Sequence, residues 1–526
     1  MFGAGPSIVA AAETDAEQIA AGSTISRIVI ERQNVFDLEN PDENNAFYRF
    51  TNRFHPITRE NTVSKQLLFD EGDEFDLRLI AESERILRRN KYLYDATITP
   101  KTNGQGDVDI LVSTRDVWSL TPEISYSRSG GENKTKFGLE ESNLFGTGQF
   151  VMLTHSDDVD RTSTAFEYSD RQIGDSWVSL GFRVADNSDG QNARLEVAKP
   201  FHALDARWSA GLTAFDDDRR SALYSLGNEV AEYRHDRSFV SVFRGWSAGL
   251  KNARVRRWTA GLVHDDNRFS AVSNPVLPQA IPENRKLNYP FIGLELLEDH
   301  FEKSSNHDQI DRSEDFYLGK RFSATLGWSS TELDADRDAL LYNLSASRSY
   351  GSLKDRALLL LATVSGREEN GDSANRTATI NARYYWRQSD KRLFFALIDA
   401  TSGHNLDLDN SIEIGGDSGL RGYPLRYQSG DSRMLVSMEQ RYFTDWYPFR
   451  LFRVGGAIFF DAGRVWGNNP IGGPNLGWLK DVGFGLRFAP TRFGTRKIVH
   501  FDIAFPLDGD ATIDEVQILF EAKRSF

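Results

Sequence analysis

The feature that most constrains the fold of this chain is a regular alternation of apolar and polar residues in short runs after residue 117. One run sets four apolar residues against four charged, polar or small ones: Trp208, Ala210, Leu212 and Ala214 against Arg207, Ser209, Gly211 and Thr213. Ala324, Leu326 and Trp328 alternate with their neighbours in the same way. A period of two places successive side chains on opposite faces of a β-strand, with one face in an apolar environment. The sequence therefore predicts a mainly β protein built from amphipathic strands.

The hydropathy of the chain narrows the environment that these strands face. Mean hydropathy is −0.47, and no stretch approaches the ~18 to 20 consecutive apolar residues that a membrane-spanning helix requires. A closed β-barrel crosses a membrane without such a stretch, because alternate residues face lipid and lumen. At about 25 residues for each strand and its connection, residues 118–526 predict a transmembrane antiparallel β-barrel of about 16 strands.

Charge and cysteine content exclude several classes of function. The 526 residues carry a formal net charge of −14 and no cysteine. Nucleic-acid binding is disfavoured because it requires a basic surface that neutralises phosphates. Disulfides and thiol chemistry are excluded, which is compatible with an oxidising compartment. Acidic groups such as Asp157 and Asp158 fall between strand patterns and are interpreted as solvated loops, so we predict neither a metal site nor a cofactor.

Residues 24–117 follow a different order of patterns. Ile28 and Ile30 alternate as a first strand, a loop with Pro41 and Pro56 follows, and a helix is predicted over residues 58–69. A second helix begins after Asp76, a good N-cap. Two strands at residues 96–100 and 108–114 are joined across an Asn-Gly turn at residues 103–104. This order predicts a small α+β domain ahead of the barrel.

The first 23 residues are predicted to lie outside both domains. Residues 2–12 are mostly small and apolar and end in three alanines before Glu13. This resembles the end of a secretory signal with its cleavage site, although the basic start is missing. We interpret residues 1–23 as a signal remnant or a disordered N-terminus.

Two segments near the C-terminus carry the most specific signal. One reads GGDSGLRGYP over residues 415–424, and the other reads AIFFDAGRVW over residues 457–466. A carboxylate at Asp461, on a packed strand position, would be costly to desolvate without a cationic partner. The glycine-flanked Arg421 is a suitable partner, so the sequence predicts contact between the loop and the strand.

Enzyme functions are not supported by the motifs. Residues 416–419, Gly-Asp-Ser-Gly, echo the nucleophile region of trypsin-like proteases, but the tetrapeptide is short and the usual flanking cysteines are absent. The nine histidines show no metal-binding spacing. No glycine loop suited to phosphate binding is present. We therefore predict that the protein is not an enzyme.

Together, the two segments resemble the signature of the BamA/TamA, or bacterial surface antigen, superfamily of outer-membrane assembly barrels. The resemblance implies that a long loop folds back into the barrel and that Arg421 binds Asp461 and Glu439 there. It also implies a loop tip formed by six residues: Gly415, Gly416, Leu420, Gly422, Tyr423 and Pro424. Phe459 and Gly463 complete the strand motif and, by period two, share the lumenal face with Asp461.

The resemblance extends to both ends of the chain. The order strand, helix, helix, strand, strand over residues 24–117 is similar to a single POTRA domain, the periplasmic module of this superfamily. The last strand carries Phe520 on an apolar face and ends at Phe526. This is similar to the C-terminal signal by which outer-membrane barrels are recognised for insertion.

The function implied by the resemblance is assistance to the insertion or translocation of client proteins at a bacterial outer membrane. Unfolded or nascent outer-membrane or secreted proteins would be received by the POTRA-like domain in the periplasm. Periplasmic lipoproteins or chaperones are further expected partners, besides the lipid bilayer. A secretion pore for one dedicated partner protein and a passive outer-membrane channel are the alternatives.

Overall fold

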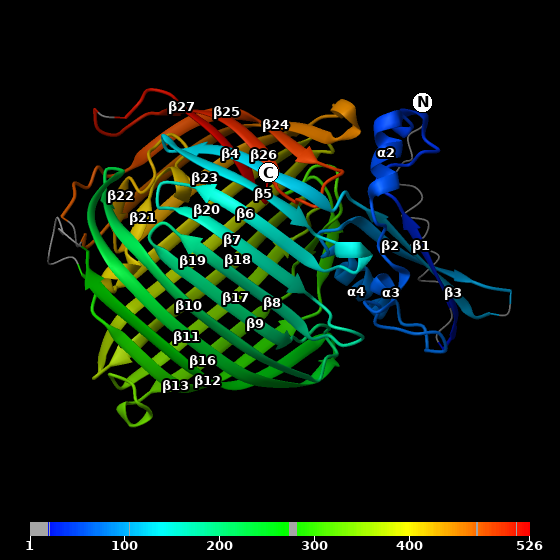
Figure 1. Cartoon of the computed structure of the whole chain (residues 1–526), viewed down its shortest axis with the longest axis horizontal. Helices are drawn as coiled ribbons and strands as arrows, with labels where there is room; N and C mark the ends of the chain where they lie inside the picture. Colours follow the sequence, from blue (N-terminus) through cyan, green and yellow to red (C-terminus); the bar gives the residue numbers. More distant parts are fainter. Residues whose placement is uncertain are drawn as a thin grey trace.

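The computed structural model describes residues 19, 22–104, 106–272, 281–469, 472–511 and 513–525. They form a β-barrel with a small α+β domain at one end (Figure 1). Phe526 and the alanines of the expected signal remnant lie outside the described residues.

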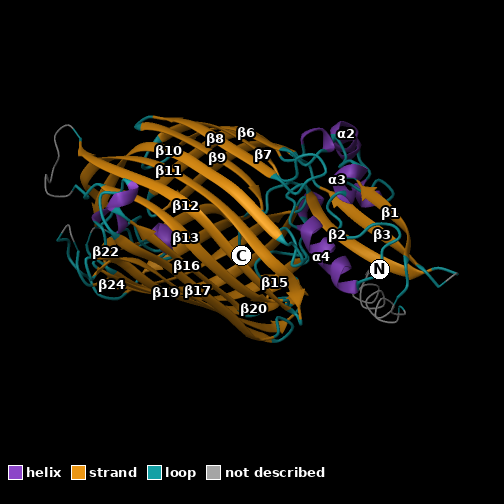
Figure 2. Cartoon of the chain, turned by 90° about the horizontal axis from the view of Figure 1, so that it is seen from below, coloured by secondary structure: helices purple, strands orange, loops and turns teal. Residues whose placement is uncertain are grey.

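The N-terminal domain contains a three-stranded sheet covered by helices (Figure 2). The strands are β1 (Ile25–Gln33), β2 (Leu93–Thr102) and β3 (Val108–Asp116). Their order is β1-β3-β2, with β1 parallel and β2 antiparallel to β3. The helices are α2 (Ala46–Phe54), α3 (Glu60–Ser64) and α4 (Leu77–Arg88).

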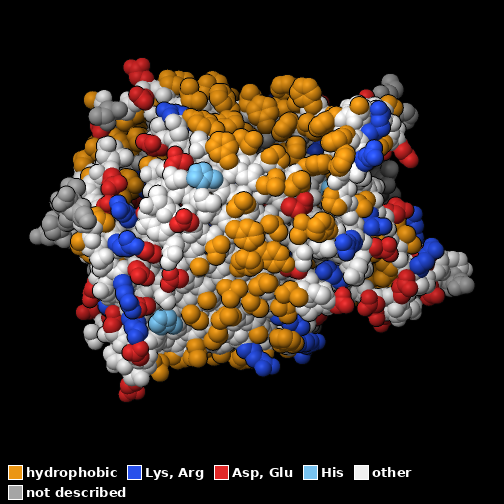
Figure 3. Space-filling view, in the orientation of Figure 1, with side chains coloured by type: hydrophobic (Ala, Val, Ile, Leu, Met, Phe, Trp, Pro, Cys, Tyr) orange, Lys and Arg blue, Asp and Glu red, His pale blue; other side chains and the backbone are white. Residues whose placement is uncertain are grey.

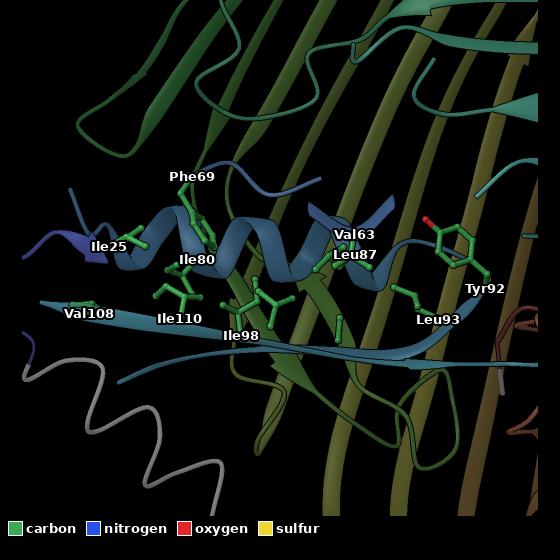
Figure 4. Packing of buried hydrophobic residues seen from close by; sticks show 12 residues of the cluster. Ile25, Val63, Phe69, Ile80, Leu87, Tyr92, Leu93, Ile98, Val108 and Ile110 are labelled. Carbon is green, nitrogen blue, oxygen red and sulfur yellow. The ribbon is translucent and has the colours of Figure 1, made fainter. Parts of the chain in front are cut away.

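Helix α4 supplies much of the core of this domain (Figure 4). Asp76 caps the helix by accepting a hydrogen bond from the Arg78 N–H at 2.8 Å. Ile80 and Leu87, seven residues apart on one helical face, are buried in a cluster with sheet residues such as Ile110. The domain therefore has an apolar core of its own beside the barrel.

Two helices of the domain differ from the sequence prediction. The helix expected over residues 58–69 is reduced to the five-residue α3. Helix α2 lies where a loop was expected, and Asn45 caps it by accepting a hydrogen bond from the Tyr48 N–H at 3.0 Å. Prolines on both sides obscured this local signal. Within the described ranges, no helix is long and apolar enough to cross a membrane.

Twenty strands close the barrel within the described part of the chain. In chain order they are β4 (Leu120–Ser129), β5 (Glu132–Glu141), β6 (Phe150–Asp157), β7 (Thr162–Asp170), β8 (Ser179–Asn187), β9 (Gly190–Lys199), β10 (Trp208–Ser225), β11 (Asn228–Lys251), β12 (Arg254–Ala271), β13 (Arg285–Glu298), β16 (Arg321–Ser329), β17 (Ala339–Gly351), β18 (Arg356–Glu369), β19 (Asp372–Ser389), β20 (Arg392–His404), β23 (Ser432–Phe443), β24 (Phe452–Trp466), β25 (Leu479–Pro490), β26 (Ile498–Pro506) and β27 (Gln517–Lys523). Every neighbouring pair is antiparallel.

The mainly β class and the closed antiparallel barrel are confirmed, but the prediction of about 16 strands is wrong. The error comes from the assumed length of the connections. Several neighbours are joined by two-residue turns, as between β18 and β19, where Asn370 and Gly371 both have positive φ. Such turns match the twist of antiparallel strands and use few residues. More strands therefore fit into the same length of chain.

The strands alternate between an apolar outer face and a mostly polar lumenal face. In β10, Trp208 is 45% exposed and its neighbour Ser209 is 2% exposed. Figure 3 shows hydrophobic side chains as a broad band over the barrel, with charged side chains gathered at the end away from the N-terminal domain. This is the surface of a barrel whose wall contacts lipid.

The closure of the barrel is uneven. Strands β10 and β11, on one side, share 18 register pairs. On the other side the last strand, β27, meets the first, β4, at the single pair Phe520 and Arg128. We call the contact between β27 and β4 the seam; Figure 1 shows both strands at the top of the barrel.

Two segments leave the wall. Residues 405–431, the lumenal loop, contain the short hairpin of β21 (Ile412–Ile414) and β22 (Gln428–Gly430). Residues 299–320, the rim insertion, contain β14 (Phe301–Ser304) and β15 (Glu314–Tyr317) and lie at the end that carries the N-terminal domain. Short 3₁₀ turns occur at Pro41–Glu43, Leu144–Gly146, Thr331–Leu333, Leu408–Asn410, Gly416–Ser418 and Pro448–Arg450.

Candidate functional site

The structure brings Arg421 of the lumenal loop against the inner face of β23 and β24. Its Nε and Nη2 donate to the two carboxylate oxygens of Asp461 at 2.7 and 2.9 Å. Its Nη1 donates to Glu439 Oε1 at 2.7 Å. Paired donors on one carboxylate form the strongest geometry available to arginine. The loop is thereby attached to two adjacent strands by one guanidinium.

This ion network is removed from water. Asp461 is fully buried, and Arg421 and Glu439 are each 6% exposed. The guanidinium also lies 3.4 Å from the ring centroid of Phe459, which covers it from the side. Buried charges of opposite sign stabilise one another only while all members are present.

Two glycines allow the loop tip to lie this close to the wall. A Cβ at Gly422 would come within 2.7 Å of the Asp481 Cβ. Its N–H instead donates to Asp481 Oδ2 at 3.0 Å. A Cβ at Gly416 would meet the Tyr423 carbonyl at 2.6 Å. Larger residues at either position would push the tip away from the strands.

The remaining residues of the loop tip pack against, or form hydrogen bonds with, the adjacent barrel wall. Leu420 and Tyr423 are fully buried in one apolar cluster. The Tyr423 hydroxyl lies 2.7 Å from the Lys480 carbonyl and accepts the Lys480 N–H at 2.9 Å. Pro424 lies beside the turn between β10 and β11, where a Cβ on Gly227 would come within 2.9 Å of its Cβ. Gly463 faces the loop residue Ile414, and Gly415 leaves no room for a side chain beside Pro424.

The first part of the lumenal loop is tied to two further strands of the wall. Arg285 of β13 forms paired hydrogen bonds with Asp409 at 2.7 and 3.0 Å. Arg367 of β18 does the same with Asp407 at 2.6 and 3.0 Å. The loop is therefore bonded to β13 and β18 as well as to β23 and β24. Beside it lies a polar cavity of about 820 Å³, lined by residues that include Arg237, Asp265 and Tyr289.

Sequence reasoning missed the buried charges around the network. Arg441 donates to Glu439 at 2.8 Å and to the His307 carbonyl of the rim insertion at 2.7 Å. On the next strands, Arg487 pairs with Asp502 at 2.5 Å, both fully buried. The sequence could have indicated them, because period-two counting places these residues on the lumenal face of their strands.

The rim insertion connects the lumen to the N-terminal domain. Arg88 of α4 donates to both carboxylate oxygens of Asp315 at 2.8 and 2.6 Å. The Tyr94 hydroxyl donates to the Asp311 carbonyl at 2.7 Å, and Arg312 donates to the Leu93 carbonyl at 2.8 Å. The insertion therefore contacts helix α4 and strand β2 at one side and Arg441 at the other.

Phe520 of the expected C-terminal signal lies at the seam. Its side chain is 36% exposed on the outer face of β27, opposite Arg128. The chemistry of the site is that of fixed ion pairs and hydrogen bonds. In the part of the chain that the structure describes, no group of three or more His, Cys, Asp or Glu side chains is placed to hold a metal ion.

Comparisons with known proteins define the class of fold. No family model and no curated protein sequence matches the chain. Among solved structures, CdiB from Escherichia coli matches with a TM-score of 0.50 and 13% identity over 95% of this chain and 76% of that one. CdiB from Acinetobacter baumannii matches at 0.46 and 14%, over 95% and 73% of the two chains. BamA from Haemophilus ducreyi lacking POTRA domains 1–3 matches at 0.37 and 13%, over 95% and 84%.

The similarity to Escherichia coli CdiB establishes the fold: a closed barrel of this general type with an α+β region ahead of it. The resemblance predicted from the two sequence segments is thus confirmed at the level of the fold. A closed barrel with an apolar outer band supports an outer-membrane location.

Proposed function

We propose that this protein is an outer-membrane barrel that assists the insertion or translocation of client proteins, which its N-terminal domain receives from the periplasm. The observation that carries the proposal is the seam, which has one register pair, whereas β10 and β11 share 18. A seam with few hydrogen bonds opens at low cost. Opening exposes unpaired strand edges to which an incoming strand can bond.

The lumenal loop supports this proposal because it stabilises the wall beside the seam. Arg421 joins β23 to β24, and the Gly422 N–H reaches β25. The strands that lead to the seam are therefore held from inside. Movement at the seam can then occur without loss of the rest of the barrel.

The client-binding edge of the POTRA-like domain is assigned to β1. On β2, the other edge, Glu84 of α4 already accepts the Ile98 N–H at 3.0 Å, and Pro100 has no N–H to offer. On β1, the Ile28 N–H points away from β3 to Glu71 at 2.8 Å, and Ile30 and Arg32 share this direction. An extended client segment would add beside Ile30 and Arg32.

The alternative is a secretion pore for one partner protein, and the similarity of fold to CdiB favours it among the other readings. A pore and an insertase differ in whether the lumen conducts ions when no client is bound. Single-channel recordings of the purified protein would give large, stable conductance for a pore. An insertase closed by the loop and the rim insertion would give little.

The test is the rate at which a urea-unfolded outer-membrane barrel inserts into liposomes that contain this protein. We expect faster insertion than in empty liposomes. The variant Ile30→Pro removes one β1 N–H and should lower the rate. Its matched control is Ile98→Pro on β2, which removes an N–H that Glu84 already binds. Equal rates with and without folded protein would overturn the proposal, and a loss confined to the β2 variant would move the client to the other edge.

A further inference from the structure

Helix α2 presents its apolar face outward. Phe47, Phe50 and Phe54 are 63%, 57% and 60% exposed, and the rings of Phe50 and Phe54 lie 4.5 Å apart. The neighbouring face, with Tyr48 and Thr51, is buried against the protein. An amphipathic helix of a soluble domain normally buries its apolar face. Three exposed phenylalanines along about two turns of helix therefore indicate a surface that contacts lipid or another protein.

The helix is fixed to the rim of the barrel. The Tyr48 hydroxyl donates to the Phe449 carbonyl, in the turn between β23 and β24, at 2.5 Å. Tyr48 also stacks on Phe36 at 4.1 Å, and Leu451 packs against the cluster that contains these two rings. Ion pairs join Asp42 to Arg450 and Glu43 to Arg492. The orientation of α2 relative to the wall is therefore set by several contacts.

The barrel turn beside α2 exposes apolar side chains of its own. Trp446 is 60% exposed and Phe449 is 79% exposed. Figure 1 places α2 next to this turn, and Figure 3 shows hydrophobic side chains continuing from the barrel band toward that corner. The phenylalanine face of α2 thus continues the surface by which the barrel meets lipid.

Two cations flank the phenylalanines. Arg49 and Arg53 are exposed, and neither forms an ion pair with a carboxylate among the described residues. Arginine beside an apolar helical face suits the headgroup region of a membrane, where its charge meets lipid phosphate. Arginines without carboxylate partners beside exposed phenylalanines suit an anionic lipid surface, which offers phosphates and acyl chains together.

We propose that α2 lies in the lipid surface next to the barrel, with its three phenylalanines among the acyl chains and Arg49 and Arg53 at the phosphates. The occupant of the exposed face is the bilayer itself, in the leaflet on the side of the N-terminal domain. This rests on the proposed placement of the barrel in a membrane. The proposal goes further, because it gives the N-terminal domain its own contact with the membrane and sets the angle of the domain to the bilayer.

The test places single labels on a chain that has no cysteine. An environment-sensitive fluorophore at Phe50→Cys is compared with one at Ile458→Cys, on the outer face of the wall, and one at Lys101→Cys, at the far end of β2. The full-length protein is reconstituted in phosphatidylethanolamine vesicles with phosphatidylglycerol and nitroxide-labelled lipid. We expect quenching at positions 50 and 458 to exceed that at position 101 by about fivefold or more.

Each outcome separates the inference from the proposed function. Quenching at position 458 without quenching at position 50 overturns the inference and leaves the barrel in the membrane. Absence of quenching at both overturns the membrane placement as well. Quenching at position 50 that disappears when an unfolded client is added, or cross-linking between two copies through position 50, would identify a protein-docking face instead. The variant Arg49→Glu/Arg53→Glu should reduce quenching at position 50 and leave position 458 unchanged.

Discussion

The two sides of the barrel are stabilised in different ways. The side formed by β10 and β11 relies on its own ladder of 18 register pairs, and a cavity of about 820 Å³ borders its inner face. The side formed by β23 to β27 has shorter strands that end in a single pair at the seam. Its inner face carries the buried charges Arg421, Glu439 and Asp461. Side-chain bonds from the lumenal loop hold β23 and β24, on the side of the barrel that contains the seam.

This difference indicates a division of tasks. Separating β10 from β11 would break a long ladder of backbone hydrogen bonds, so this side is suited to staying closed. A seam of one pair can part while the neighbouring strands are held by a loop. The following predictions test this contrast, from the largest expected effect to the smallest.

The largest effect should come from locking the seam. Paired positions on antiparallel strands have Cα atoms close enough for a disulfide. We expect Arg128→Cys/Phe520→Cys to lose nearly all insertion activity when oxidised and to regain it on reduction. The matched lock, Leu212→Cys/Val242→Cys across β10 and β11, should leave activity unchanged. If both locks behave alike in the liposome assay, the seam is not where clients act.

Removal of the loop arginine should cause the next largest effect. Arg421→Ala leaves Asp461 and Glu439 buried without a counter-ion, which costs about 3 to 5 kcal/mol. We expect a lower urea midpoint and lost heat resistance of the folded barrel on gels, with membrane targeting retained. Arg421→Lys should recover only part of the stability, because one ammonium cannot bond both carboxylates as the guanidinium does. Full heat resistance and full activity in Arg421→Ala would contradict this assignment.

Acid should loosen the rim insertion by a smaller amount. Burial, with Arg387 nearby, lowers the pKa of His307 to about 4. Because the folded pKa lies below the ordinary value, the stabilisation is complete above about pH 6.5 and is lost as pH falls toward 4, at roughly 1.4 kcal/mol per unit. Hydrogen exchange of residues 299–320, corrected for intrinsic rates, should rise over this range. The variant His307→Gln should not show the rise; an equal rise would assign it to other groups.

The smallest effect is expected on the long-strand side. Arg237 and Asp265 form paired hydrogen bonds at 2.9 Å, but the arginine side chain is 35% exposed to the cavity. Arg237→Ala should change the free energy of unfolding by about 1 kcal/mol or less. Urea titration beside Arg421→Ala checks the contrast directly. A loss as large as that of Arg421→Ala would show that both sides depend on buried charge.

The sequence was most informative where a residue type conflicted with its position. Asp461 lies at a strand position that the alternation predicts to be packed, so its carboxylate requires a cation. The glycines around Arg421 indicate a segment that can approach the barrel wall closely. The structure brings these residues together. The alternation of residues around Trp208 likewise predicted which side chains face outward.

The rest of the fold depends on features that the alternation of apolar and polar residues does not reveal. The number of strands follows from turn lengths, and two-residue turns such as Asn370-Gly371 are not distinguished from longer ones by alternation. Helix α2 buries polar residues and exposes phenylalanines, which is the reverse of the pattern that indicates a helix in a soluble domain. The strands of the rim insertion, at Phe301–Ser304 and Glu314–Tyr317, are too short to show a period.

The rim insertion has a mechanical consequence. Asp315 is held by Arg88 of the N-terminal domain, and the carbonyl of His307 is held by Arg441, which also bonds Glu439 in the lumen. These two anchor points are eight positions apart in the sequence. A rotation of the domain must therefore either break the Arg88 pair or pull on the arginine that shares a carboxylate with Arg421. The rim insertion therefore links movement of the N-terminal domain to the loop inside the barrel.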